Sequence, residues 1–192
     1  MKGKVITGFS KPYVALYSAT EGVVSYSSGQ ELAEGVGVSI QPEVSDPQNY
    51  YLNNAIGETI GGEFIGGTAT LTVNGLKQSA LKLITGAPTA DAEGFLNYGK
   101  AVKAPFVGLG FIIRYLSEGV TSYCPVILKK AVLNPLSIEA NTQGEEVEFQ
   151  SQELEFALSR DDSADAVWQR MGGEVETEAD AEEAIQIALG IS

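Results

Sequence analysis

The clearest pattern in the chain is a strict alternation of apolar and hydroxyl side chains between residues 68 and 73. Ala69, Leu71 and Val73 alternate with threonines at the intervening positions. Successive side chains of a β-strand point to opposite faces of a sheet, so this period of two predicts a strand with one apolar face and one hydroxyl face. Asn74 and Gly75 follow it and predict a turn.

Most of the remaining chain consists of short segments rich in β-branched and aromatic residues, separated by turns that contain glycine. Two segments have helical periodicity instead: residues 76–85, followed by Gly86, and residues 177–189, where Thr177 can cap an acidic first turn. We therefore predict a mainly β fold with one flanking helix and an acidic C-terminal helix. The expected strands are 5–9, 13–18, 23–27, 32–41, 106–116, 121–132 and 147–159.

Residues 42–62 interrupt this regular pattern. The stretch is rich in Asn, Gly, Pro and Asp and shows neither strand nor helix periodicity. Loops of about twenty residues without structure of their own are uncommon and usually functional or disordered. This one carries Tyr50, Tyr51, Leu52 and Ile56, which argues against simple disorder. We predict a long functional loop.

Composition limits the chemistry of the chain. The 192 residues suit one domain, or one domain with an appendage, and none of them is a histidine, which excludes imidazole bases, histidine metal ligands and Ser-His-Asp triads. The net charge is −13, and residues 145–192 hold 14 acidic and 2 basic residues. This acidity is either a solvated surface or a surface that repels phosphates. The single cysteine, Cys124, suits a protein kept in a reducing cytoplasm.

Several short motifs resemble catalytic or binding signatures but lack required residues. Gly94 and Lys100 have the spacing of a phosphate-binding loop, yet Ala101 stands where Ser or Thr should ligate magnesium. Gly108 and Gly110 open a dinucleotide-binding pattern without its third glycine, so we expect a bulge or a close backbone approach. A calcium-like acidic run at 161–165 lacks its glycine. We expect no catalysis, no cofactor and no metal.

Four passages, taken in order, resemble the major tail proteins, or tail tube proteins, of long non-contractile-tailed bacteriophages. They are residues 4–13, 45–54, 64–76 and 150–162. No one of these passages is exclusive to that family, and their collinear order carries the resemblance. Residues 173–192 fall outside it.

The resemblance implies a tail-tube β-sandwich or barrel over residues 1–172, followed by an acidic helical extension over 173–192. It implies a structural virion protein that forms hexameric rings, stacked into a hollow tube through which phage DNA leaves. The implied partners are other copies of the chain, the tape measure protein and the tail-end proteins, with transient passage of unbound DNA and no membrane. Assembly would take place in the cytoplasm of the host bacterium.

Two sets of site residues follow from this resemblance. The long loop would contact the neighbouring ring through Ser45, Asp46, Asn49, Tyr50, Tyr51, Leu52, Asn53, Asn54 and Ile56. Acidic residues in or near the late strand would line the bore and keep DNA from binding, namely Glu146, Glu148, Glu153 and Glu155. The alternative is that these glutamates solvate the outer wall.

Two rival functions remain open at the level of sequence. The chain could be a β-sandwich binding module, such as an adhesin or another virion component. It could also be an enzyme built on a β-sandwich, such as a glycosidase, although no pair of carboxylates stands out among its 25 acidic residues.

Overall fold

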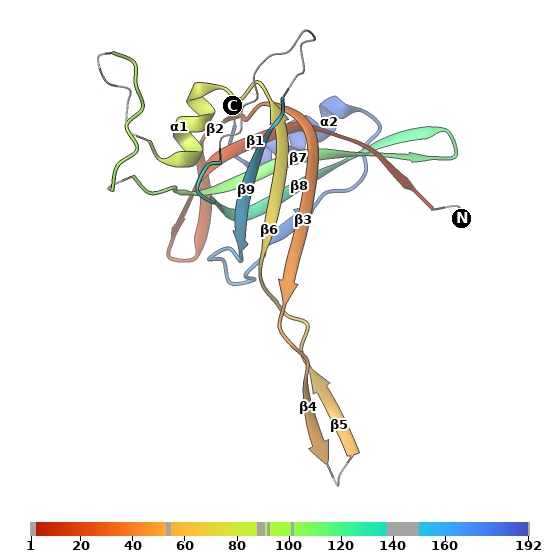
Figure 1. The fold of residues 1–192 in the computed structure, drawn as a ribbon. Helices are drawn as coiled ribbons and strands as arrows, with labels where there is room; N and C mark the ends of the chain where they lie inside the picture. The colour runs from red at the N-terminus through yellow and green to blue at the C-terminus, as the bar shows by residue number, and fades with distance from the viewer. Residues whose placement is uncertain are drawn as a thin grey trace.

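A computed structural model describes residues 3–52, 55–87, 91, 93–100, 102–137 and 150–191, with the backbone alone for 48–52 and 55–60. Strands dominate the described part of the chain, as the alternating patterns predict (Figure 1). The elements are β1 (Val5–Thr20), β2 (Val23–Glu31), β3 (Glu34–Val44), β4 (Gln48–Leu52), β5 (Ala55–Ile60), β6 (Phe64–Asn74), α1 (Gln78–Thr85), β7 (Phe106–Ser117), β8 (Val120–Leu133), β9 (Gln152–Ser159), β10 (Gln169–Met171) and α2 (Glu178–Ala188).

One antiparallel sheet organises the body in the order β2-β1-β7-β8-β9-β6-β3, and β10 pairs with β8 at its side. The sheet curls, so that its last strand, β3, returns close to β1. A side chain at Gly35 of β3 would collide with the ring of Phe9 in β1, and the Leu32 amide donates a hydrogen bond to the Pro12 carbonyl at 2.8 Å. The result is a partly closed barrel, which agrees with the predicted fold class.

Strand β1 is longer than its sequence indicates. We expected two strands, 5–9 and 13–18, separated at Lys11 and Pro12, but a single strand runs through both residues. Lys11 has a positive φ of 52°, and the pairing with β7 shifts between Ser10 and Tyr13. A bulge therefore absorbs the irregular residues and allows the strand to continue.

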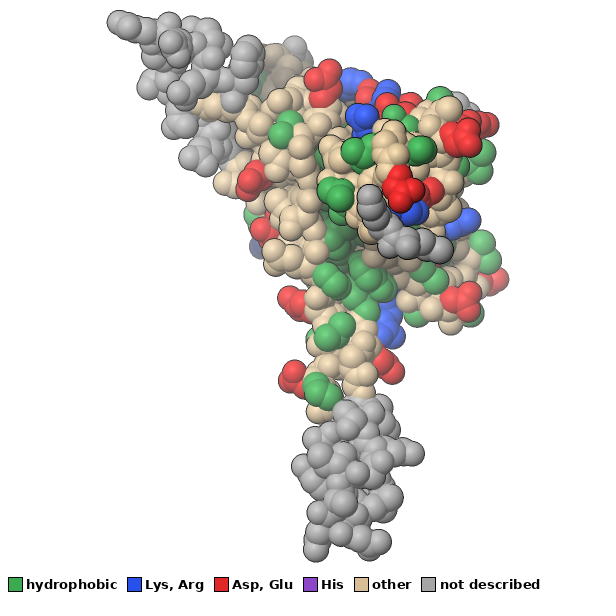
Figure 2. Space-filling view, turned by 90° about the vertical axis from the view of Figure 1, so that its right-hand side faces the viewer, with side chains coloured by type: hydrophobic (Ala, Val, Ile, Leu, Met, Phe, Trp, Pro, Cys, Tyr) green, Lys and Arg blue, Asp and Glu red, His purple; other side chains and the backbone are tan. Residues whose placement is uncertain are grey.

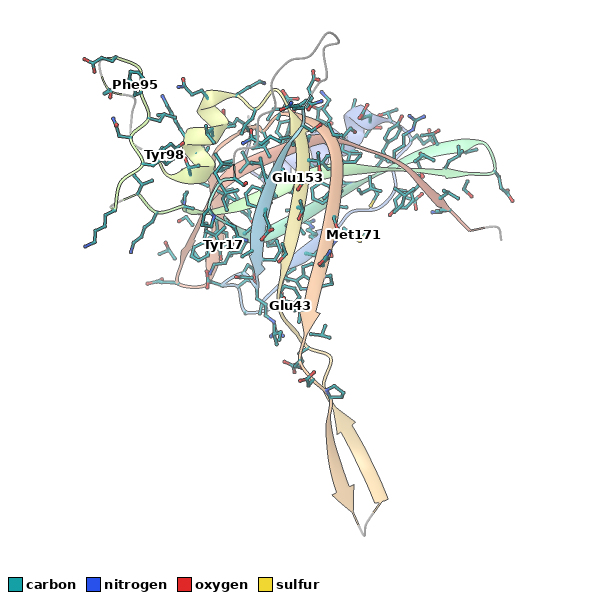
Figure 3. The ribbon with its side chains drawn as sticks, viewed as in Figure 1. Tyr17, Glu43, Phe95, Tyr98, Glu153 and Met171 are labelled. Carbon is teal, nitrogen blue, oxygen red and sulfur yellow. The ribbon has the colours of Figure 1, made fainter. Side chains whose placement is uncertain are left out.

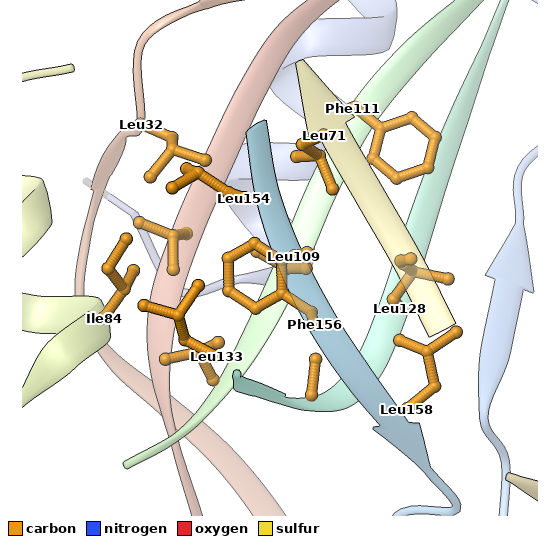
Figure 4. Close-up of a cluster of buried hydrophobic side chains, with 14 of the residues drawn as sticks. Leu32, Leu71, Ile84, Leu109, Phe111, Leu128, Leu133, Leu154, Phe156 and Leu158 are labelled. Carbon is orange, nitrogen blue, oxygen red and sulfur yellow. The ribbon is translucent and has the colours of Figure 1, made fainter. Parts of the chain in front are cut away.

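The sheet is buried on both faces over β1, β7 and β8. Alternate residues of each strand enter two different apolar clusters: Leu109 and Phe111 point into the larger one, whereas Ile112 points into the smaller one. Strands covered on both faces read as continuous apolar runs, which explains why residues 107–113 show no alternation. Figure 4 shows the larger cluster, where side chains of β6, β7, β8, β9 and α1 meet.

Helix α1 covers one end of the larger cluster. It buries Ala80 and Ile84 completely, and it ends at Gly86, whose φ of 66° is the left-handed conformation common after a helix. The predicted helix over 76–85 is confirmed, with a start two residues later.

Helix α2 covers the opposite face of the sheet. Ile185 of α2 and Leu189 at its C-terminal cap are fully buried. A Cβ added at Gly110 of β7 would collide with Ile185, and one added at Gly108 would collide with the Tyr26 ring and come close to Leu189. The glycines thus allow a close approach of helix to sheet, as their positions in the sequence indicate. The predicted cap is also confirmed, because the Asp180 amide donates to Thr177 Oγ1 at 3.2 Å.

Candidate assembly surfaces

Strands β3, β6 and β9 present a polar face that no helix of the described residues covers. In β6, Ala69, Leu71 and Val73 are fully buried, so the threonines between them lie on the opposite face. Partners in an antiparallel register share a face, and this places further polar residues beside the threonines. We call these residues the polar face: Ser39, Gln41, Thr68, Thr70, Thr72, Glu153 and Glu155.

Two of the four predicted lumen residues belong to the polar face. Glu153 and Glu155 pair with Thr72 and Thr70, respectively, and both are exposed, while Leu154 between them is fully buried (Figure 3). The Glu155 carboxylate accepts a hydrogen bond from the side-chain amide of Asn134. The other two lumen candidates, Glu146 and Glu148, lie outside the described residues, as do residues 147–149 of the predicted late strand.

The polar face contains residues that sequence reasoning missed. Ser39 and Gln41 of β3 lie in register with Thr70 and Thr68 of β6. The signal for them was the parity of Val38 and Ile40, which pack against the core and leave the intervening residues on the other side. Strands β3, β6 and β9 contain no Lys or Arg at all. The polar face therefore offers a phosphate no cationic partner from its own strands.

The sheet ends on two long unpaired edges within the described residues. Strand β3 pairs only with β6, and β2 pairs only with β1. Each edge presents a row of backbone N–H and C=O groups that can pair with a strand of another chain. Sheet extension between copies is thus geometrically available along both edges.

The predicted long loop contains two paired strands that the sequence pattern did not indicate. Strand β3 continues to Val44, and β4 and β5 pair antiparallel, with Gln48 opposite Ile60 and Leu52 opposite Ala55. The pair projects well beyond the body of the molecule (Figure 1). Backbone groups pair β4 with β5, and this pairing does not require an alternation of apolar side chains. The sequence pattern therefore did not reveal these two strands.

A narrow neck joins this projection to the body. The Ser45 amide donates to the Glu63 carbonyl at 2.8 Å, and the Gly62 amide donates to the Ser45 carbonyl at 3.2 Å. The two segments of the neck pass so close to each other that a Cβ at Gly61 would collide with Pro47. Arg160 secures the base by donating to the Phe64 carbonyl at 2.9 Å. These contacts fix the direction in which β4 and β5 leave the body.

The predicted loop residues divide between the neck and the projection. Ser45 and Asp46 lie in the neck, and Ser45 Oγ also accepts a hydrogen bond from the Glu63 amide at 3.2 Å. The predicted positions 49–52 and 56 lie on β4 and β5. Asn53 and Asn54 lie outside the described residues.

A buried carboxylate fixes the chain just after β9. Asp161 is only 5% exposed; its Oδ1 accepts hydrogen bonds from Ser163 Oγ at 2.6 Å and from the Val167 amide at 2.9 Å, and its Oδ2 forms an ion pair with Lys129 Nζ at 3.4 Å. Burial raises the pKa of Asp161, but the Ser163 hydrogen bonds and the Lys129 charge outweigh it and hold that pKa below its usual value. These contacts order the loop that contains Asp161 and attach it to Lys129 of β8.

The only cysteine of the chain, Cys124, is buried. Burial raises the pKa of the Cys124 thiol, which disfavours the reactive thiolate. No group of three potential metal-ligating side chains occurs in the described part of the chain. No helix among the described residues is long and apolar enough to cross a membrane.

No protein-family model matches the chain, and no curated protein matches it. Its function is therefore inferred from the geometry of the polar face, the sheet edges and the projection, together with the resemblance carried by its sequence.

Proposed function

We propose that the chain is the repeating structural subunit of a phage tail tube, in which copies form hexameric rings that stack into a hollow conduit for DNA. The observation that carries this proposal is the polar face. It is a sheet surface of hydroxyl, amide and carboxylate groups on three strands without Lys or Arg, and no helix of the described residues covers it. Such a surface suits a wet bore more than a packing interface.

The absence of cations on these strands matters because DNA must move along the bore. Each Lys or Arg that contacts a phosphate releases counterions and adds affinity, which would retain the duplex inside the tube. Glu153 and Glu155 repel phosphates instead and keep the duplex mobile. The proposed role of DNA is that of a passing cargo without specific binding.

Ring formation and ring stacking use different parts of the chain in this proposal. Pairing between the sheet edges at β3 and β2 of neighbouring copies would extend the sheet around the ring and remove its unpaired edges. The projecting β4 and β5 would reach the adjacent ring, from a direction fixed by the neck. The tape measure and tail-end proteins are the further partners, inside the bore and at the tube ends.

Negative-stain electron microscopy of the purified chain tests the proposal. We expect rings or hollow tubes at high protein concentration, or after addition of a tail initiator. A chain that stays monomeric at every concentration, with the initiator present, would contradict the proposal. It would favour the binding-module alternative, for which the open pocket of about 590 Å³ between Leu81 of α1 and the start of β9 is one candidate site.

Deletion of Asp46–Gly61 separates stacking from folding. It removes β4 and β5 and joins Ser45 to Gly62, whose backbones are already hydrogen bonded at 3.2 Å. We expect a folded subunit with the far-UV circular dichroism of the remaining sheet but without long tubes. Tubes of normal length from this variant would refute the stacking role of the projection.

A further inference from the structure

Three lysines occur in α1 and in the segment that follows it, the segment that also carries two exposed aromatic side chains. Lys82 belongs to α1, and Lys100 and Lys103 to the following segment. Figure 3 shows the aromatic residues of this segment, Phe95 and Tyr98. None of these lysines forms an ion pair with a residue that the structure describes. We call these five residues the basic flank.

Asp91 orders the backbone of the turn that carries Phe95, and both aromatic side chains of the basic flank are exposed. The Asp91 carboxylate accepts hydrogen bonds from the Phe95 amide at 2.8 Å and from Asn97 Nδ2 at 2.9 Å, and the Asp91 amide donates to the Phe95 carbonyl at 3.0 Å. Phe95 is 68% exposed and Tyr98 is 54% exposed. Fixed, exposed aromatic side chains are typical anchors of protein interfaces.

A surface of opposite charge lies along α2. Residues 173–192 contain six acidic residues and no basic one. Glu174 pairs with Lys4, just before β1, and Glu178 and Glu182 contact Ser10 and Lys11 of β1. Two more, Glu176 and Glu183, are exposed and have no ion-pair partner among the described residues. Figure 2 views the molecule from the right-hand side of Figure 1, where acidic side chains lie beside exposed apolar ones.

An apolar groove accompanies these carboxylates. It measures about 290 Å³ and lies between α2 and the β8–β10 pair, with Pro125, Ala184 and Ile187 in its wall and Arg170 at its rim. Ile187 is 72% exposed, although it lies on the same helix as the fully buried Ile185. We call Glu176, Glu183 and this groove the acidic flank.

We propose that the basic flank of one copy docks on the acidic flank of the next copy, with Phe95 or Tyr98 in the groove. Charge complementarity selects this occupant: the lysines match Glu176 and Glu183, and the exposed Glu93 matches Arg170. The basic and acidic flanks of one copy cannot contact each other, because α1 packs on the larger apolar cluster and α2 packs on the opposite face of the sheet.

The two flanks are different surfaces, so the contact is head-to-tail, and head-to-tail contacts close into rings when the rotation allows. The inference rests on the proposed function, since it assigns the contact to neighbours within a ring. It adds a side-chain interface on the outer part of the body to the backbone pairing proposed for the sheet edges.

Charge reversal tests the contact. In one variant Lys100→Glu and Lys103→Glu make both flanks acidic; in another Glu176→Lys and Glu183→Lys make both flanks basic. We expect each variant alone to self-associate at least about tenfold more weakly than the wild type by analytical ultracentrifugation at low salt, where surface charges are least screened. An equimolar mixture should regain association, because the two variants can alternate around an even-numbered ring.

A control reversal, Glu21→Lys in the β1–β2 turn, should associate like the wild type, since Glu21 is exposed and belongs to neither flank. Disulfide trapping gives a second readout that does not depend on charge. A mixture of Tyr98→Cys and Ile187→Cys should form mixed dimers in preference to like dimers, and Tyr98→Cys with Glu21→Cys should not.

The outcomes separate this contact from the tube proposal. Charge-reversed variants that associate like the wild type, or mixed dimers no more frequent than the control pair, would overturn the contact even if wild-type tubes form. Restored association and selective trapping without rings or tubes in electron micrographs would support the contact and contradict the tube. Preferential Ile187→Cys like dimers would mean that the groove packs against its own copy, which also overturns the head-to-tail contact.

Discussion

Truncation of Ile185 tests whether the C-terminal helix is part of the folded body. The side chain of Ile185 points from α2 toward the sheet. It is fully buried, together with Leu189, against Gly110 and Ile112 of β7. The change Ile185→Ala removes apolar contacts and leaves a cavity. Gly110 has no side chain that could move into that cavity, so we expect little relaxation.

The magnitude follows from this lack of relaxation. Truncation of a buried isoleucine to alanine costs about 2–5 kcal/mol of unfolding free energy, more where the site cannot collapse. For a domain of 150–250 residues, each kcal/mol shifts Tm by about 2–4 °C. We therefore expect Ile185→Ala to lower Tm by roughly 4–20 °C. The matched control is Ile187→Ala on the same helix, which is 72% exposed and should change stability by less than about 0.5 kcal/mol.

Urea unfolding monitored by far-UV circular dichroism measures both variants, at protein concentrations where the chain is monomeric. The control keeps the change in helix propensity similar, because both variants replace isoleucine by alanine in the last turn of α2. Equal losses for the two variants would show that α2 does not pack on β7 in solution. A loss confined to Ile185→Ala would instead make residues 173–192 a stabilising part of the fold.

Three further predictions use local features of the fold. Gly86→Ala should destabilise the chain by more than about 1 kcal/mol in thermal melts, because φ is 66° and the new Cβ would meet a backbone carbonyl, whereas Gly99→Ala has open space. Thr177→Ala should cost about 1 kcal/mol through loss of the α2 cap, read from urea midpoints. Asp161→Asn should cost about 1–3 kcal/mol at pH 7 by leaving Lys129 unpaired. The lowered pKa of Asp161 means that its stabilisation is present above the unfolded carboxyl pKa and is lost as pH falls through the folded pKa, so the difference from wild type should shrink in acid melts.

Local patterns in the sequence predicted the elements whose signals are complete within a few residues. The alternation over 68–73 appears as fully buried Ala69, Leu71 and Val73. The cap at Thr177 and the glycine after α1 appear where their types require them. In each case the backbone conformation and the burial pattern depend on residues nearby in the chain. The sequence alone was therefore enough to predict these elements.

The features that sequence missed depend on partners distant along the chain. The pairing of β4 with β5 needs no apolar alternation, and the neck depends on Gly61 passing close to Pro47. The sequence left open which face of the sheet carries the glutamates of β9. Alternation along a strand separates two faces, but only the position of the core shows which face is buried. Burial of Leu154 and Phe156 on one side leaves Glu153 on the other.

The two halves of the sheet differ in what covers their second face, and this difference bears on function. Over β1, β7 and β8 both faces are apolar, and α2 covers the second face with Ile185 and Leu189. Over β3, β6 and β9 the second face is polar, and no helix in the described part of the chain covers it. A subunit that acts alone could have had an apolar second face, covered by a helix, over all of these strands. In the tube that we propose, the polar strands without cations would face the shared aqueous bore, and the half covered by α2 would form the outer wall.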